Sequence, residues 1–288
     1  MTQPAVLAAG ECHQHDQAEY VGTLAAACLH LEVRTHPKPG MVSHLDCGSH
    51  TDMDAALLHR SANVLRPYFS ELWAAGRAGA GMAHLRRVGM AAERAMLAAT
   101  SQVNTHRGAI FGLGLLAAAA GFRASCRRKA PLGRILARLW GRGILSGPVA
   151  LHSHGTRAML QYGVGGARHE AAAGFPSLYR IAIPALLEGQ SLSPYDPESA
   201  RIHACMALIA SVSDTNLLHR GGREGLQFAR RAASRFLAAG GVGHPGWRAE
   251  AQRMHLEFVE RRLSPGGCAD LLAMALFVRS IESEDDSP

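Results

Sequence analysis

Apolar residues recur at three- and four-residue spacing along most of the chain, which is the pattern of amphipathic and buried helices. The segments with this spacing are rich in Ala, Leu, Arg and Glu, which favour helix. No stretch alternates β-branched with polar residues, and no strand–glycine–helix opening of a dinucleotide-binding fold occurs. We therefore predict an all-α fold, with helices over residues 20–33, 55–75, 82–100, 108–120, 149–162, 200–212, 224–239, 247–262 and 269–281.

Glycine and proline clusters separate these segments, and none is long enough to link two domains. Residues 1–18 are mostly small or polar and aperiodic, and residues 282–288 (ESEDDSP) are acidic. We predict a single multi-helix domain: a flexible N-terminal segment at 1–18, an all-α catalytic domain over 19–281 and a flexible acidic tail at 282–288.

The formal net charge of +7 predicts an anionic partner. Only two of the 30 basic residues are lysines, and the forked arginine side chain suits phosphate better than a diffuse lysine-rich surface for nucleic acid would. We therefore expect small, phosphate-rich ligands and no nucleic acid.

Six scattered cysteines form no CxxC pair, and the N-terminus lacks the pattern of a signal peptide. The most apolar run, residues 108–121, has the length of a buried core helix rather than of a membrane span. A cytoplasmic protein without a membrane segment is expected.

The segment PKPGMVSHLDCGSHTDMD, residues 37–54, places Lys38 between two prolines. The prolines stiffen the backbone, so we expect an exposed loop that presents the ammonium group as a fixed charge for phosphate. Three aspartates follow it: Asp46, Asp52 and Asp54. Thr51 or Asp52 is expected to cap a helix starting near Met53, which explains one acid. Three acids together repel one another unless they share a cation or a proton, which favours magnesium.

The segment NTHRGAIFG, residues 104–112, places four polar residues before the most apolar helix. Their side chains and the free amides of the first helical turn can face one anion. A plain cap by Asn104 or Thr105 explains the same pattern, and Arg107 favours ligand binding.

In the segment YGVGGARHEAAAGFP, residues 162–176, Gly163, Gly165 and Gly166 let the backbone approach a ligand or adopt a turn with positive φ. Arg168 and Glu170 follow at the expected start of the next helix. The pattern is neither GxGxxG nor a Walker A loop, so the glycines alone are a weak signal.

The segment SDTNLLHRGGREG, residues 213–225, offers oxygen ligands at its start and basic donors around Gly221 and Gly222. A helix C-terminus with a glycine-based stop is the plainer interpretation, but the density of polar groups favours a functional site. Near the end, SPGGCADLLA places Asp270 at a helix start, where we expect capping rather than catalysis.

Taken together in this order, PKPGMVSHLDCGSHTDMD, NTHRGAIFGLGLL, YGVGGARHEAAAGFPS, DTNLLHRGG and SPGGCADLLA resemble the triphosphoribosyl-dephospho-coenzyme A synthase family. The resemblance covers residues 32–275, nearly all of the predicted domain. The sequence of residues 44–54 and 104–112 resembles the malonate decarboxylase branch more closely than the citrate lyase branch. Cys47 and Arg107 depart from the pattern, which leaves their contacts open.

The resemblance implies a transferase in which the ribose 2′-hydroxyl of 3′-dephospho-coenzyme A attacks C1 of the ATP ribose and expels adenine. The product would be the prosthetic-group precursor of a carrier protein, with a holo-carrier-protein transferase as a possible partner downstream. ATP and 3′-dephospho-coenzyme A would be the substrates and Mg²⁺ the cofactor, since a retained triphosphate needs a counter-ion.

The residues that match the family's motifs receive roles on this basis. Acid–base work or substrate positioning is expected of Asp52, Asp214, His106 and Glu170. ATP and phosphate binding is expected of Lys38, Asn104, Arg107, Gly165, Gly166, Arg168, His219 and Arg220. Magnesium binding is expected of Asp52, Asp54, Asp214 and Asn216.

The residues themselves leave two other classes open. A magnesium-dependent, all-α nucleotide or ADP-ribose hydrolase would use the same acids and arginines without needing the coenzyme. A basic helical nucleic-acid-binding module would bind in a steeply salt-dependent way without turnover.

Overall fold

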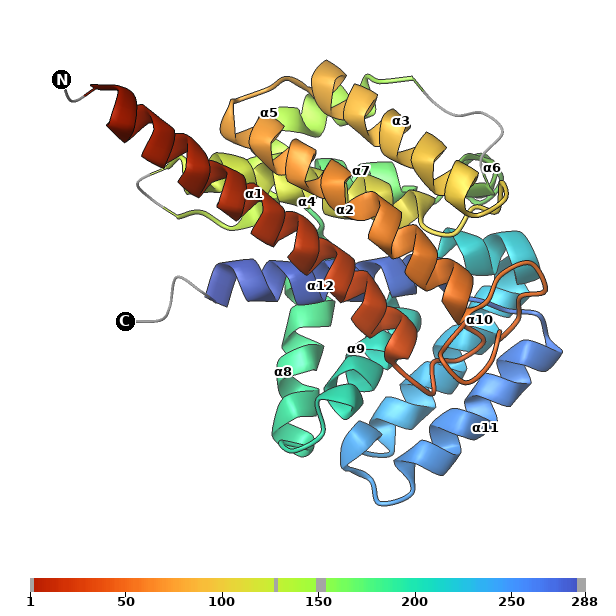
Figure 1. The fold of residues 1–288 in the computed structure, drawn as a ribbon. Coiled ribbons are helices and arrows are strands. Elements are labelled where there is room, and N and C mark those ends of the chain that lie inside the picture. Colours follow the sequence, from red (N-terminus) through yellow and green to blue (C-terminus); the bar gives the residue numbers. More distant parts are fainter. Residues whose placement is uncertain (1–2, 127–128, 149–153, 284–288) are drawn as a thin grey trace.

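The computed structural model describes residues 3–126, 129–148 and 154–283. All regular structure in these ranges is helical, which confirms the predicted all-α fold (Figure 1). The elements are α1 (Gln3–Arg34), α2 (Ala55–Arg77), α3 (Met82–Ala99), α4 (Arg107–Ala124), α5 (Leu132–Leu145), α6 (His154–Tyr162), α7 (Gly166–Ala172), the π-helical η1 (Leu178–Ala182), α8 (Ile183–Leu192), α9 (Pro197–Ser211), α10 (Thr215–Ala238), the 3-10 turn η2 (Gly241–Gly243), α11 (Trp247–Glu260) and α12 (Gly266–Ser283).

Helix α4 is the centre of the core, because it is apolar on every side and must be enclosed by other helices. It packs against α2, α3, α5 and α12. The approach of α2 is very close: a Cβ atom at Gly76 would lie 1.9 Å from the carbonyl oxygen of Ala118, and one at Gly121 would lie 1.9 Å from that of Trp73. By length and composition α4 could cross a membrane, but 72% of it is buried inside the protein, as predicted for a core helix.

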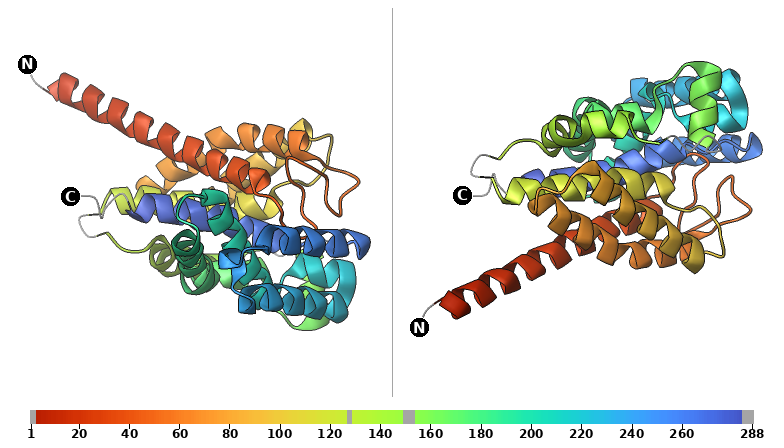
Figure 2. Two further views of the ribbon diagram at one scale, coloured as in Figure 1. Left: turned by 90° about the horizontal axis from the view of Figure 1, so that it is seen from below. Right: turned by 90° about the horizontal axis from the view of Figure 1, so that it is seen from above.

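Helix α12 passes through the middle of the molecule, between the layer of α1, α2 and α3 and the group formed by α8, α9, α10 and α11 (Figures 1 and 2). It contacts α1, α4, α9 and α10. The first turn of α12 therefore lies where elements from both ends of the chain meet.

Several elements differ from the sequence prediction. Helix α1 begins at Gln3, inside the segment predicted to be flexible, and its N-terminal half projects away from the other helices (Figure 2). The prediction missed α5 and α8, whereas α7 lies where a helix was expected to start near Arg168 and Glu170. For the helix predicted over 149–162, the described part begins at His154 and residues 149–153 lie outside the described ranges. The acidic tail lies outside them beyond Ser283.

Candidate active site

The N-termini of α4, α10 and α12 meet at one place. Asp214, the residue before α10, accepts a hydrogen bond of 2.9 Å from the amide of Cys268 in the first turn of α12. Asp270 in α12 reaches the start of α4, where a Cβ atom at Gly108 would lie 2.0 Å from its Oδ2. Helix N-termini carry partial positive charge and free amides. Their meeting point is suited to binding phosphate.

The turn between α6 and α7 lies beside this place. Gly163 and Gly166 both have positive φ, as a tight turn between two helices requires. A Cβ atom at Gly166 would lie 3.8 Å from the side chain of Thr215, the first residue of α10. The structure thus brings together the two sequence segments 162–176 and 213–225.

Asp214 caps two helices at once. Its Oδ1 accepts from the amides of Asn216 and Leu217 at 2.7 and 3.2 Å, and its Oδ2 from that of Cys268. The residue is 2% exposed. Burial raises the pKa of the carboxyl group, and the three amides act in the opposite direction. Its observed contacts are those of a cap, and its predicted metal and proton-transfer roles stay predictions.

Lys38 does not lie on an exposed loop, so that prediction is wrong. The lysine is 1% exposed, and its ammonium group is paired with the carboxylate of Glu32. The same group donates to the backbone carbonyl of Glu32 at 2.6 Å. The tight loop folds back onto the C-terminal turn of α1, because a buried ammonium group must be paired. Phosphate binding by Lys38 stays a prediction, and it would have to compete with Glu32.

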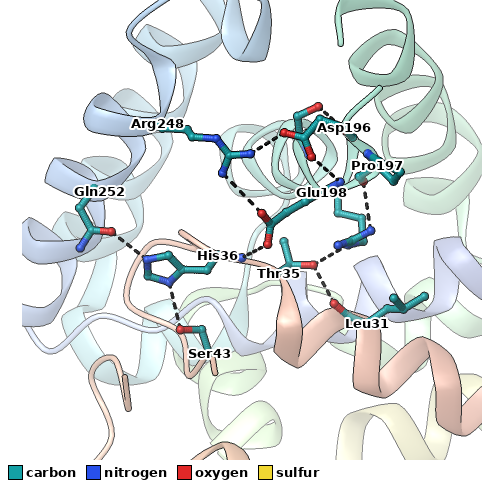
Figure 3. Close-up of polar contacts among 11 residues, drawn as sticks. Leu31, Thr35, His36, Ser43, Asp196, Pro197, Glu198, Arg248 and Gln252 are labelled. Atoms are coloured by element: carbon teal, nitrogen blue, oxygen red, sulfur yellow. Dashed lines mark hydrogen bonds and ion pairs between the residues drawn. The ribbon is translucent and has the colours of Figure 1, made fainter. Parts of the chain in front are cut away.

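The loop that carries Lys38 is held by α9 and α11 (Figure 3). The amide of His36 donates to Glu198 at 3.1 Å, and its ring nitrogens contact Ser43 at 3.0 Å and Gln252 at 2.9 Å. Arg248 in α11 binds Glu198 in turn, at 3.4 Å. Burial is the main cause that lowers the pKa of His36, which favours the neutral ring.

A second histidine, His255 of α11, completes this support. The Nδ1 of His255 lies 2.8 Å from the carbonyl oxygen of Lys38, and its Nε2 lies 3.2 Å from the carboxylate of Asp46. Asp46 also accepts from the amide of Gly48 at 2.8 Å. The backbone on both sides of the lysine is therefore fixed by polar contacts.

His106 is buried at the start of α4. Its Nδ1 lies 2.8 Å from the hydroxyl of Ser61, which accepts a hydrogen bond of the same length from Thr105. Burial lowers the pKa of His106 to about 3, and the positive charges of His30, His59 and Lys38 add to this effect. The ring is neutral near neutral pH, so His106 is not suited to act as a protonated general acid. Substrate positioning by His106 stays a prediction.

The side chain of Arg220, in the segment 213–225, contacts the segment 37–54. Its guanidinium group donates to the carbonyl oxygens of Ser49 and Arg262 at 3.1 and 3.2 Å. It also lies 3.2 Å from Nδ1 of His50, which is 3.4 Å from the carboxylate of Asp52. Burial followed by the charge of Arg220 lowers the pKa of His50. Asp52 is 59% exposed at its side chain and can reach a ligand.

The three aspartates predicted to share one cation each make a different contact. Asp54, and not Thr51 or Asp52, caps α2, accepting from the amide of Leu57 at 2.8 Å, and the helix begins at Ala55. Asp46 is engaged by His255 and Asp52 by His50. Within the described ranges, no three His, Cys, Asp or Glu side chains gather as a metal site.

Arg107 and Asn104 are engaged at the surface end of α4. Arg107 forms an ion pair with Glu93 of α3, and Asn104 accepts from the amide of Arg107 at 3.3 Å, as a cap would. Asn216 packs its side chain against Gly266, where a Cβ atom would lie 3.0 Å from Nδ2. His219 is exposed on α10.

Arg168 and Glu170 stabilise local structure. The guanidinium group of Arg168 donates to the last carbonyl groups of α5 and the residues after it, including those of Leu145 and Gly147, both at 2.9 Å. Glu170 accepts from the amide of Ser177 at 2.7 Å. Ligand roles for either residue would require these bonds to break, and they stay predictions.

Two acids of this site received no catalytic role from the sequence. Glu32 pairs with Lys38, and Asp270 lies at the junction of α4 and α12. The charges of Glu32 and Asp214 both act on Asp270. In the sequence, Gly266 and Gly267 before Cys268 indicate close packing at this helix start. The contact between Asp270 and α4 joins residues too distant in sequence for any local pattern to reveal.

A separate cavity of about 490 Å³ lies between α10 and α11. Its lining includes Arg235, His244, Glu250 and Arg253, and none of the site residues above. It is one alternative location for a ligand on this molecule.

Comparison with known proteins gives a consistent result. Residues 18–288 match the family model described as ATP:dephospho-CoA triphosphoribosyl transferase. A Klebsiella pneumoniae protein named 2-(5''-triphosphoribosyl)-3'-dephosphocoenzyme-A synthase is 38% identical, over 92% of this chain and 96% of its own. Proteins given the same name with the prefix "probable" are 38% identical in Acinetobacter calcoaceticus (91% and 90% covered) and 39% in Azotobacter vinelandii (92% and 92%). No solved structure matches the chain.

Proposed function

Since the chain belongs to the ATP:dephospho-CoA triphosphoribosyl transferase family and is a transferase, we propose that it joins the triphosphoribosyl group of ATP to the ribose 2′-hydroxyl of 3′-dephospho-coenzyme A and releases adenine. The observation that carries the proposal is the meeting of α4, α10 and α12 through Asp214 and Asp270. The partial positive charge of three helix N-termini favours a triphosphate there, although Asp214 already accepts from first-turn amides of α10 and α12.

The acids beside this place suit the chemistry. Displacement at the anomeric carbon of a ribose passes through an oxocarbenium-like state, for which flanking carboxyl groups supply proton transfer and charge stabilisation. The charges of Glu32 and Asp214 both act on Asp270. Lys38 pairs with Glu32, and its charge also acts on His106.

Magnesium belongs to the proposal through ATP rather than through a preformed protein site. Asp52, Asp54, Asp214 and Asn216 do not fit a shared ion: Asp54 and Asp214 are capping, and Asp52 contacts His50. Mg²⁺ often takes most of its ligands from substrate phosphates and water.

For the acceptor, we propose a strong preference for 3′-dephospho-coenzyme A over coenzyme A. A 3′-phosphate would crowd the attacking 2′-hydroxyl and bring negative charge to a site that already holds three acids and a triphosphate. The product would serve a malonate decarboxylase carrier protein in the cytoplasm, with a holo-carrier-protein transferase acting after it. Five of the six cysteines, Cys28, Cys47, Cys126, Cys205 and Cys268, are free, which supports a reducing compartment.

The test is an incubation of the purified protein with ATP, Mg²⁺ and an equal mixture of 3′-dephospho-coenzyme A and coenzyme A, followed by chromatography and mass spectrometry. We expect adenine and the dephospho-coenzyme product in equal amounts, and none of either in excess chelator. Adenine or another nucleotide fragment formed without any acceptor would favour a hydrolase. Comparable use of coenzyme A would contradict the acceptor preference.

A further inference from the structure

A second hollow, of about 510 Å³, lies along α10. Its lining residues all belong to this helix and are Phe228, Arg230, Arg231, Ser234 and Arg235. Three of these side chains carry a positive charge and none carries a negative one. None of them received a role in the candidate active site, so the hollow is a basic surface that the proposed function leaves unused.

The charges of Arg231 and Arg235 are not balanced by acids of the protein. The two residues are exposed and lie four positions apart, one helical turn along α10. Within the described ranges, neither guanidinium group forms an ion pair. Glu250 and Glu257 line the neighbouring cavity together with Arg235, but Arg253 binds both of them. Like charges at this spacing repel each other, so an anion between them would be stabilising.

Arg230 adds a third charge in a fixed position. Its Nη2 donates to the carbonyl oxygen of Ser211 at 3.1 Å and to the hydroxyl of Ser213 at 2.9 Å. These two bonds hold the guanidinium group beside the hollow. Its Nε is buried and has no hydrogen-bond partner among the described residues. A buried donor without an acceptor is unfavourable, and an oxyanion bound in the hollow would bring acceptors to this side chain.

The lining favours a particular kind of anion. Arginine binds phosphate oxygens through forked pairs of N–H donors, and the hydroxyl of Ser234 adds a further donor. A phosphate group offers three strong acceptor oxygens, whereas a carboxylate offers two. Phe228 contributes an apolar wall, over which the guanidinium group of Arg261 lies at 4.2 Å from the ring centroid. A hollow of this volume holds more than a single phosphate group.

We propose that the hollow lined by Arg230, Arg231, Ser234 and Arg235 binds the diphosphate group of a small ligand. Arg231 and Arg235 bind its oxygens from the exposed side of α10, and Arg230 supplies the fixed charge. Inorganic pyrophosphate and a diphosphate ester such as 3′-dephospho-coenzyme A share this chemistry. The inference goes beyond the proposed function and does not depend on it.

The first test is protection of arginine side chains from phenylglyoxal, which modifies accessible guanidinium groups, followed by peptide mapping with mass spectrometry. We expect pyrophosphate to protect Arg231 and Arg235. Arg134 and Arg138 are the internal control and should react equally with and without it, because they are also exposed and four positions apart, on α5. Sodium chloride and citrate at the same ionic strength should protect at least about tenfold less well, since they supply charge without phosphate oxygens.

The source of the diphosphate group follows from the same measurement with 3′-dephospho-coenzyme A. Half-protection of Arg235 at a lower concentration of the coenzyme than of pyrophosphate would identify an ester, whose organic part adds contacts such as one with Phe228. Half-protection at a lower concentration of pyrophosphate would identify the inorganic ion. Either order supports a diphosphate site.

The second test replaces one arginine and observes another. In Arg231→Gln, the pyrophosphate concentration that gives half-protection of Arg235 should rise about tenfold or more, because charge-assisted hydrogen bonds are lost. Arg134→Gln is the matched control and should leave this concentration within about twofold of wild type. Both residues are exposed, so the fold should be retained, and circular dichroism checks this.

Three results would overturn the inference: equal reactivity of Arg231 and Arg235 with and without either diphosphate, protection by citrate as strong as by pyrophosphate, or unchanged protection of Arg235 in Arg231→Gln. All three are measured without turnover of ATP. Failure of this inference is therefore distinguishable from failure of the proposed function.

Discussion

The ammonium group of Lys38 is paired with the carboxylate of Glu32 inside the protein, where the lysine is 1% exposed. The proline on each side explains why the chain can turn a charged side chain inward: the stiff backbone directs it back onto the end of α1. The pair is therefore a structural element as well as a candidate contact for phosphate.

Replacing Lys38 with Met should leave a buried carboxylate without its partner. We expect a loss of about 3–5 kcal/mol in the free energy of unfolding, measured by urea denaturation. Adding Glu32→Gln should recover part of this loss, because the two effects share one interaction. The control is Lys129→Met at the other lysine, which is exposed and should change stability by less than about 0.5 kcal/mol. Equal stability of the two single variants would contradict the buried pair.

Asp214 and Asp54 offer a matched pair of helix caps. Asp54 is exposed and caps α2 alone, so Asp54→Ala should cost about 1 kcal/mol. Asp214→Ala should cost clearly more, because buried amides of both α10 and α12 lose their acceptor. Thermal unfolding of both variants checks this, and a smaller effect at Asp214 would show that the two helices do not depend on it.

His106 should make the fold sensitive to acid. Its pKa is about 3 in the folded protein and near 6.5 in the unfolded chain, so the unfolded state binds the proton more tightly. Stability is full above about pH 6.5 and falls as pH decreases towards 3, by up to about 1.4 kcal/mol per pH unit from this residue. His106→Asn should lose less stability than wild type between pH 7.5 and 4.5 in urea titrations. Parallel curves for the two proteins would mean that the ring is not held neutral.

Helix formation was predictable where the apolar spacing is uninterrupted, as in α4 and α9. The pattern in α5 was obscured by its three glycines, Gly133, Gly141 and Gly143, although Leu132, Ile135, Leu136 and Trp140 line its buried face. The helix at the N-terminus was missed because the sequence before Ala18 shows no regular apolar spacing. Both helices were missed because their sequences do not show a regular apolar stripe.

The site segments were predictable as a set, whereas their contacts were not. Arg168 looks like a phosphate ligand in sequence and binds the end of α5, and Asp270 looks like a cap and lies against α4. Local spacing reports which residues begin a helix. Which helix ends meet is decided by packing between residues 54 positions apart, as for Asp214 and Cys268, or much further apart, as for Gly108 and Asp270. A single sequence does not display these contacts.

The most direct test of the central claim, that the meeting point of α4, α10 and α12 binds the nucleotide, is amide hydrogen exchange followed by mass spectrometry with and without ATP and Mg²⁺. We predict slower exchange in residues 104–112, 213–220 and 264–272, where the first-turn amides would face the triphosphate. Unchanged exchange in these segments, together with protection around Arg235, His244 and Arg253 in the cavity between α10 and α11, would contradict it.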